Sequence, residues 1–223
     1  MPTPTPDPSG VSLNLFANPG FEQGETAWTY RDAAEWRPFA ISDAVAYRQQ
    51  HSLELRLEST DADTGTRIVG AVQELRPTEL PEYLSGWYRV DEWTAGATHQ
   101  YVQFVVAVYG ADYEDEFDLH EVRFPIVGIE SDPFTLTNAR WRYLSRDRAP
   151  ELGEWTYFGY PVRAAFEEAW GRAPAGFDRI DVFFEVRYDN KQPGQGASTA
   201  TVYFDDVYLG LFATNPNRPG FIE

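Results

Sequence analysis

The feature that most constrains the fold of this chain is a period of two in the placement of its apolar residues. In the segment 51–59, Leu53, Leu55 and Leu57 alternate with charged residues. Successive side chains of a β-strand point to opposite faces of its sheet, so such a segment buries one face and exposes the other. The segment 101–109 is instead almost wholly apolar, as expected of a strand that is covered on both faces.

Segments of this kind recur along the chain and are separated by clusters of glycine, proline, asparagine and aspartate. The predicted strands are residues 12–16, 51–59, 71–76, 83–90, 101–109, 122–129, 140–146, 155–162, 180–188 and 200–212. Pro125 indicates an edge or a bulge in one of them. A short amphipathic helix is predicted over 162–171, after Pro161 and ending at Gly171. Many short strands with one helix predict an all-β sandwich or barrel.

The chain divides into a linker and one domain. Residues 1–10 contain the run PTPTPDPSG, and repeated Thr-Pro favours an extended spacer. We therefore predict a linker over 1–10 and a single β-sandwich domain over 11–223. The linker also predicts a secreted or surface-anchored protein whose signal or anchor is missing from this chain. The alternative is the disordered start of a cytosolic protein.

The charge balance excludes several classes of partner. With 35 acidic and 18 basic residues, the 223-residue chain has a net charge of −17. Such a surface repels phosphate backbones and anionic membranes, so neither a nucleic-acid partner nor membrane insertion is predicted. The absence of cysteine excludes disulfides and thiolate metal sites. The presence of only three histidines argues against a histidine-rich metal site.

Four pieces of the sequence together form a recognisable pattern. They are NLFANPGFEQGETAWTY (14–30), HSLELRL (51–57), the pair AVQELRP (71–77) and YLSGWYRV (83–90), and VYFDDVYLG (202–210). In this order and spacing they resemble the jelly-roll carbohydrate-binding modules of the cellulose- and xylan-binding, galactose-binding-domain-like superfamily. The resemblance implies a β-sandwich jelly roll. Residues 91–153 have no counterpart in it and are expected to form a long middle insertion.

The resemblance also implies a structural calcium site. In these modules the Glu of the Gly-Phe-Glu turn and the Asp of the closing strand ligate calcium, and the matching residues here are Glu22 and Asp205. Calcium takes six to eight oxygens, so carbonyls near His51 would have to complete the site. The alternative is that turn amides satisfy Asp205 and no ion is bound. The resembled pattern places Trp28 and Trp87 in the core.

Glycan-binding sites combine aromatic rings, which contact the flat faces of sugars, with polar side chains that fix the hydroxyl groups. One face of the 180–188 strand combines an aromatic residue with polar ones, namely Asp181, Phe183, Glu185 and Arg187. On the strand 101–109, Tyr101, Gln103 and Tyr109 share one face. The candidate ligand-binding residues are Trp36, Trp93, Tyr101, Gln103, Tyr109, Trp141, Asp181, Phe183, Glu185 and Arg187. The alternative for any single aromatic residue is packing in the core or at its rim.

The predicted function is a non-catalytic extracellular carbohydrate-binding module that targets a larger protein or a cell surface to a polysaccharide. The alternative is a structural or adhesive surface domain, such as a filament or surface-layer component, with a protein partner on 91–153. Coplanar, solvent-facing rings beside polar groups would indicate a glycan ligand. Buried rings together with a flat apolar patch would indicate a protein partner. Catalysis is not predicted: hydrolase and nucleotide-binding motifs are lacking, and Asp181 and Glu185 would lie roughly 13 Å apart on one strand.

Overall fold

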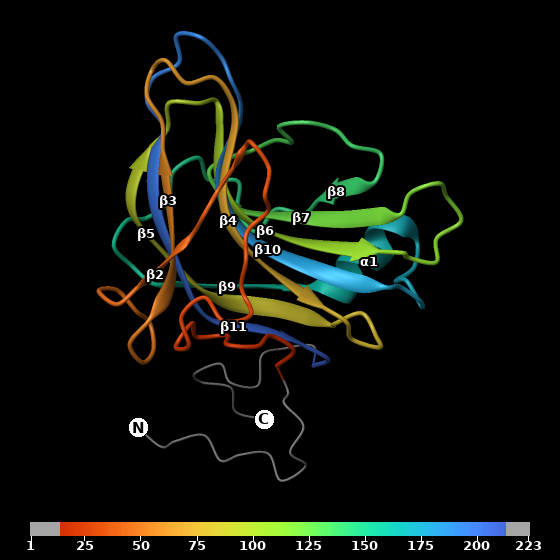
Figure 1. Ribbon diagram of the computed structural model, residues 1–223. Coiled ribbons are helices and arrows are strands. Elements are labelled where there is room, and N and C mark those ends of the chain that lie inside the picture. The colour runs from red at the N-terminus through yellow and green to blue at the C-terminus, as the bar shows by residue number, and fades with distance from the viewer. Residues whose placement is uncertain (1–13, 213–223) are drawn as a thin grey trace.

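Two facing β-sheets carry nearly all the regular structure of the computed structural model, which describes residues 14–212 (Figure 1). The elements are β1 (Trp36–Arg37), β2 (Ala40–Ser42), β3 (Ser52–Glu58), β4 (Gly65–Leu75), β5 (Tyr83–Thr94), β6 (His99–Tyr109), β7 (Leu119–Val127), β8 (Ala139–Trp141), β9 (Thr156–Pro161), α1 (Val162–Trp170), β10 (Arg179–Lys191) and β11 (Thr199–Gly210). Sheet A has the order β1-β4-β10-β6-β7-β8, and sheet B has the order β2-β3-β11-β5-β9. The all-β sandwich jelly roll predicted from the sequence is therefore the observed fold.

The core lies between the sheets and is rich in aromatic rings. Phe184 of β10 and Phe204 of β11 are fully buried, and their ring centroids lie 5.0 Å apart across the sandwich. The three leucines of β3 are fully buried as well, as the alternation predicts. Trp28 is 5% exposed and packs against Phe184, so its predicted place in the core is confirmed.

Most predicted strands are present, but three expectations differ from the structure. Residues 14–16 are not a strand: Leu15 donates one backbone hydrogen bond to Leu209, and residues 12 and 13 lie outside the described range. The predicted strand over 140–146 shortens to β8, although Arg142 and Leu144 still donate their N–H groups to the carbonyls of Arg123 and Pro125 on β7. The two short strands β1 and β2 are missed, since segments of two and three residues carry no periodicity.

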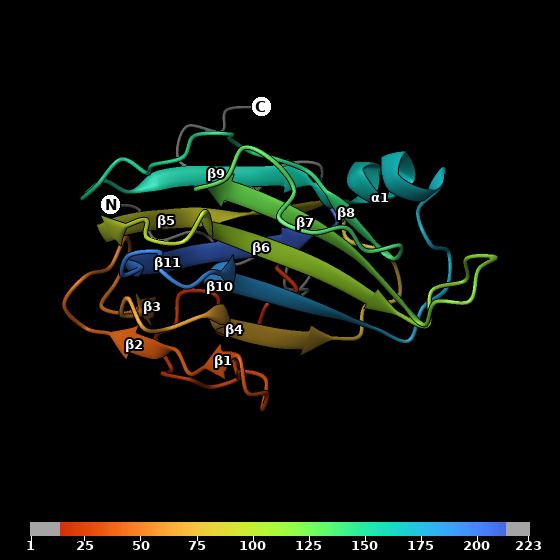
Figure 2. The same cartoon turned by 90° about the horizontal axis from the view of Figure 1, so that it is seen from above.

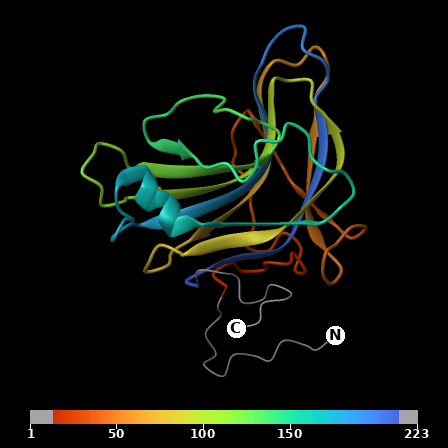
Figure 3. The ribbon, with the colours of Figure 1, turned by 180° about the vertical axis from the view of Figure 1, so that it is seen from behind.

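The predicted helix is confirmed as α1, which lies at one end of the sandwich (Figure 3). Its buried residues Val162, Ala165 and Phe166 share one face. Gly171 ends the helix with a φ of 80° and donates its N–H to the carbonyl of Glu167. Within residues 14–212, no helix is long and apolar enough to cross a membrane.

Residues 91–153 are not an insertion added to a finished sandwich. They contain β6 and β7, and β6 pairs with β10 along its whole length in the middle of sheet A (Figure 2). The pairing of β6 with β7 shifts register beside Pro125, which matches the bulge and not the edge among the two alternatives predicted there. This long middle segment is therefore an integral part of the sandwich, because it supplies half the strands of sheet A.

Candidate functional site

The outer face of sheet A gathers most of the polar and aromatic residues singled out in the sequence. On β10, Phe184 and its alternate neighbours point into the core, so Phe183, Glu185 and Arg187 point outward. The register of β10 with β6 sets Gln103 opposite Glu185 and Tyr101 opposite Arg187. Directly paired residues of an antiparallel sheet share a face, so the two strands build one surface.

A cleft of about 220 Å³ is hollowed into this face. It is lined by Arg31, Glu35, Trp36, Ile68, Val105, Glu121, Arg123, Phe183, Glu185 and Arg187, and we call it the sheet A cleft. Three arginines and three glutamates give this lining no net formal charge, although the chain carries −17. The cleft is therefore rich in hydrogen-bonding groups and suited to a ligand without a large charge.

A buried hydrogen-bonded network forms the floor of the cleft. Arg187 contacts Glu185 at 3.2 Å and Asp189 at 2.5 Å, and the Tyr101 hydroxyl donates to Asp189 at 2.5 Å. The Gln103 amide donates to Glu185 at 2.6 Å. Burial acts to lower the pKa of Arg187, but Tyr101, Glu185 and Asp189 outweigh it and raise that pKa. Arg187 therefore stays charged and holds the carboxylates in fixed positions.

Two polar atoms in or beside this network have no hydrogen-bond partner among the described residues. They are the Gln103 Oε1 and one terminal nitrogen of Arg123, Nη1, and both are buried. Arg123 lines the cleft directly, and Gln103 lies against the cleft residue Glu185. An unpartnered buried donor or acceptor is costly, so these atoms favour a polar ligand or ordered water in contact with them.

The aromatic rings of the cleft are not open platforms. Trp36 is 8% exposed and Phe183 4%, and Trp141, which lies outside the cleft lining, is 9% exposed. The Arg31 guanidinium lies 4.6 Å from the centroid of Phe183, and that of Arg123 lies 5.6 Å from Trp141. The sequence-based test for coplanar, solvent-facing rings therefore fails on this face. Recognition here would rest mainly on hydrogen bonds.

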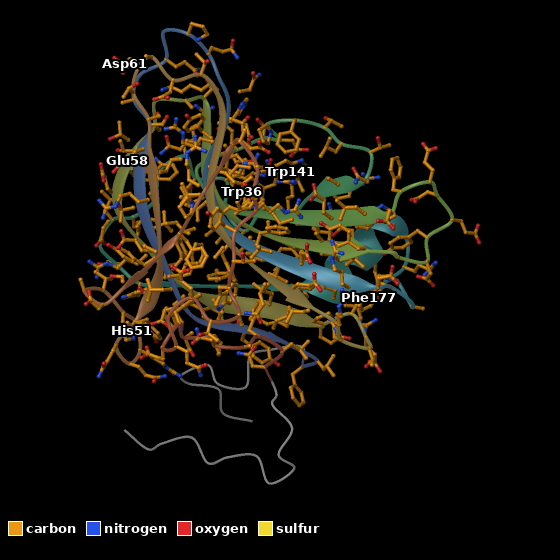
Figure 4. The ribbon with its side chains drawn as sticks, in the orientation of Figure 1. Trp36, His51, Glu58, Asp61, Trp141 and Phe177 are labelled. Atoms are coloured by element: carbon orange, nitrogen blue, oxygen red, sulfur yellow. The ribbon has the colours of Figure 1, made fainter. Side chains whose placement is uncertain are left out.

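Trp36 owes its position to a glycine. A Cβ at Gly70 of β4 would lie 2.9 Å from the Trp36 ring and 2.9 Å from the carbonyl oxygen of Phe184. The indole therefore lies directly over the backbone of sheet A at one side of the cleft. Figure 4 shows Trp36 and Trp141 on the same side of the sheet, although β1 and β8 are its opposite edges.

The remaining candidates lie at the rim or elsewhere. The Tyr109 hydroxyl accepts a hydrogen bond from Arg31 at 2.7 Å, and Asp181 contacts Arg31 at 3.7 Å, so both belong to the same face. Burial raises the pKa of Asp181, against the opposing effect of its arginine neighbours. Trp93 lies in sheet B and packs against the main core, so the structure does not bring it together with the others.

Trp87 is not in the core, contrary to the sequence-based expectation. It lies on the outer face of sheet B, where the Tyr47 ring stacks on it at 4.1 Å and the Tyr157 ring meets it edge-on at 5.4 Å. Trp155 joins this group through Tyr47. The alternation of β5 contains the signal, because Trp87 has the same parity as Arg89 and the opposite parity to the buried Leu84 and Val90.

Glu22 and Asp205 fasten one loop to the end of sheet B. Asp205 is fully buried and accepts backbone N–H groups from Tyr47 and Arg48, each at 2.8 Å. Glu22 accepts the N–H groups of Gln50 and His51 at 3.1 and 2.9 Å. We call these contacts the loop clamp, and Figure 4 shows His51 at the opposite end of the molecule from Asp61.

The two carboxylates of the clamp differ in their pKa values. Burial raises the pKa of Asp205 to about 7, against backbone hydrogen bonds that lower it. Burial also acts to raise the pKa of Glu22, but hydrogen bonds from His51 and Gln50 outweigh it and lower that pKa. At neutral pH Glu22 is therefore ionised, whereas Asp205 titrates.

The two carboxylates that the family resemblance implies as calcium ligands are hydrogen-bonded by the chain itself. Calcium needs six to eight oxygen ligands, whereas the carboxylate oxygens of Glu22 and Asp205 meet N–H donors. Within residues 14–212, no group of three or more acidic or histidine side chains is placed to hold a metal. The contacts match the alternative in which turn amides satisfy Asp205.

The clamp predicts that stability does not depend on calcium. We expect the same melting temperature with added calcium chloride and with EDTA, because the loop is held by N–H donors from the chain itself. Differential scanning calorimetry measures this. A rise of melting temperature with calcium in the parent protein, absent in Asp205→Asn, would contradict the clamp and restore a metal site.

Comparison with known proteins gives structural likenesses only. No protein-family model and no curated protein matches the sequence. Similar solved structures include a family 61 carbohydrate-binding module in complex with β-1,4-galactotriose (15% identity, TM-score 0.45, covering 89% of this chain and 98% of that chain). A second is a family 22 xylan-binding domain (14% identity, TM-score 0.45, covering 92% of this chain and 99% of that chain). A third is the enzymatically active domain of bacteriophage CBA120 tailspike protein 4 (12% identity, TM-score 0.48, covering 90% of this chain and 22% of that chain). At such identities the likeness concerns chain fold and not ligand.

Proposed function

We propose that this chain is a non-catalytic carbohydrate-binding module that binds a neutral glycan in the sheet A cleft. The observation that carries the proposal is the polar lining of the cleft, in which Arg123 has a buried Nη1 without a partner among the described residues. Sugar hydroxyl groups both donate and accept hydrogen bonds, so they suit a lining that contains both guanidinium and carboxylate groups.

The size and charge of the cleft agree with this class of ligand. At about 220 Å³ the cleft is smaller than most small-molecule pockets, so it would contact a short stretch of a polymer. Trp36 and Phe183 supply apolar surface for the C–H groups of a sugar ring. Limited contact area predicts weak binding, which suits a module that targets a larger assembly to a polysaccharide outside the cell.

The carboxylates of the cleft support a non-catalytic role. Glycoside hydrolysis needs one carboxyl group that keeps its proton and a second that is ionised. Glu121 contacts Arg123 at 2.8 Å, and Glu185 contacts Arg187 at 3.2 Å, so both carboxylates are engaged in ion pairs within the chain. Because the pKa of Asp181 is raised at the rim, the binding experiment should also measure release of reducing sugars.

Arg123→Ala tests the proposal in a screen of soluble and insoluble polysaccharides by affinity electrophoresis and pull-down. We expect the parent protein to bind at least one neutral polysaccharide and the variant to bind it about tenfold more weakly, because a charged hydrogen-bond donor to the ligand is lost. Arg56→Ala is the matched control: Arg56 also contacts a glutamate two residues earlier in the chain, but on sheet B.

Two outcomes would contradict the proposal. An absence of binding across the panel would favour the structural or adhesive alternative, with a protein partner instead of a glycan. Equal loss of binding in the two arginine variants would show that the sheet A cleft is not the site. Release of reducing sugars by the parent protein would overturn the non-catalytic part alone.

A further inference from the structure

A cavity larger than the sheet A cleft lies on another side of the molecule. It has a volume of about 450 Å³ and runs along the open side of the sandwich, between β9 and the chain that follows β8. β9 is the last strand of sheet B, and Leu144 holds the facing wall in place by donating its N–H to the carbonyl of Pro125 on β7. Figure 2 shows β9 and β7 at this side.

Tyrosines dominate the lining of this cavity, which we call the tyrosine groove. The lining residues are Tyr83, Tyr88, Ile126, Tyr143, Leu144, Ser145, Thr156, Tyr157, Phe158, Gly159 and Tyr160. Five of the eleven are tyrosines, two carry aliphatic hydroxyl groups, and none is charged. In a chain of which 24% of residues are charged, such a lining selects an uncharged ligand.

The rings of the groove are held by the sandwich and are not loose surface side chains. Tyr88 packs edge-on against Phe158 at 6.2 Å, and Tyr160 lies 5.0 Å from Phe124. A Cβ at Gly159 would lie 2.3 Å from the Tyr83 hydroxyl oxygen, so the missing side chain lets Tyr83 lie across β9. Fixed aromatic rings lose little conformational entropy when a ligand packs on them.

The geometry points to the tyrosine groove as a second saccharide site, one that takes a short linear stretch of neutral pyranose rings. Tyrosine combines an apolar ring with a hydroxyl group, and a neutral sugar ring combines an apolar face with hydroxyl groups at its edge. The site is independent of the proposed function, because it shares no lining residue with the sheet A cleft.

A proline-rich peptide is the other class of ligand that aromatic-lined grooves take. The lining favours a saccharide, because the hydroxyl groups of Tyr143 and Ser145 already donate to Asp132 and Asp147, so their oxygens can only accept a hydrogen bond from a ligand. A proline-rich peptide lacks an N–H donor at each proline. A sugar offers a donor and an acceptor at every hydroxyl position.

The test is a titration of the ¹⁵N-labelled full chain followed by NMR, with cellotriose, xylotriose and β-1,4-mannotriose as separate probes. We expect at least one trisaccharide to shift the amide signals of Gly159 and Tyr160 in a saturable way. The amides of Val105 and Glu185 report the sheet A cleft separately. Tyr83→Ala should weaken the groove response about five- to tenfold, because one stacking ring is lost.

A second groove variant and two controls keep the result interpretable. Thr156→Trp fills the mouth of the groove from an exposed position and should weaken binding there as well. Tyr30→Ala removes an exposed tyrosine outside the groove, and Arg123→Ala alters the cleft; both should leave the groove response unchanged. The peptide PTPTPDPSG serves as a further probe. The proposal is overturned if the groove amide signals shift with none of the trisaccharides, or shift only with this peptide, even if the cleft amide signals shift.

Discussion

Replacing Asp205 with alanine is expected to lower the free energy of unfolding by roughly 2–4 kcal/mol. The carboxylate is fully buried and accepts backbone N–H groups from Tyr47, Arg48 and Asp206. Its removal leaves three partly buried donors without that partner and releases the loop that carries Tyr47 onto Trp87. Urea denaturation measures the loss, and quenching of tryptophan fluorescence by a soluble quencher should increase if the loop opens.

The same carboxylate should make stability depend on pH. Its pKa is about 7 in the folded protein and 3.8 in the unfolded chain, so the folded state holds the proton more tightly. Stability from this group is full below the unfolded value and is lost as pH rises through about 7. We expect a loss of at most about 3 kcal/mol between about pH 4.5 and about pH 8 in the parent protein.

Asp205→Asn separates this titration from all others, because the amide keeps an acceptor in the loop clamp but cannot ionise. We expect the stability of this variant to change less over the same pH range than that of the parent protein. Asp61→Asn, at an exposed aspartate, is the control and should follow the parent. Identical pH profiles for all three proteins would show that Asp205 does not titrate in this range.

The second large effect is expected at Arg187, where methionine should cost roughly 3–5 kcal/mol of stability. The change leaves Glu185 and Asp189 as buried negative charges without their common partner. Methionine preserves much of the side-chain volume, so the loss reflects charge more than packing. Arg56→Met removes an exposed ion pair and should cost less than about 1 kcal/mol.

Chemical denaturation of the two arginine variants gives the comparison directly. A loss below about 1 kcal/mol in Arg187→Met would mean that water reaches the network and screens it. The network would then be part of an open surface, and its atoms would be poor reporters of a bound ligand. The expected large loss instead defines a rigid floor against which ligand hydroxyl groups can be positioned.

The sequence predicted the fold where one rule dominated each segment. The leucines of β3 and the Pro161 and Gly171 boundaries of α1 are local signals, and the structure follows them. The outward set on β10 was predicted for the same reason, because alternation fixes which residues share a face. The resembled family pattern predicts Trp87 in the core, whereas the alternation of its own strand predicts the outer face on which it lies.

Other parts of the site depend on pairings that the sequence does not encode locally. Trp36 reaches the cleft through β1, a strand of two residues that pairs in parallel with β4 across a gap of about thirty residues in the chain. The tyrosine groove joins residues of β5, β7 and β9 with the chain after β8. Sequence periodicity gives the face of each strand but not the neighbours of that strand, so neither the cleft nor the groove could be assembled from it.

The first and last described segments of the chain lie side by side, which determines how the domain responds to a pulling force. Leu15 donates its N–H to Leu209 at 2.7 Å, and Val207 donates to Pro19 at 3.0 Å, so the first residues run antiparallel to the end of β11 (Figure 1). A pull through both ends would open these bonds one after another, like a zipper, instead of shearing many at once. The first turns of the domain should thus yield at low force, while β10 and the cleft in the middle of sheet A stay unloaded.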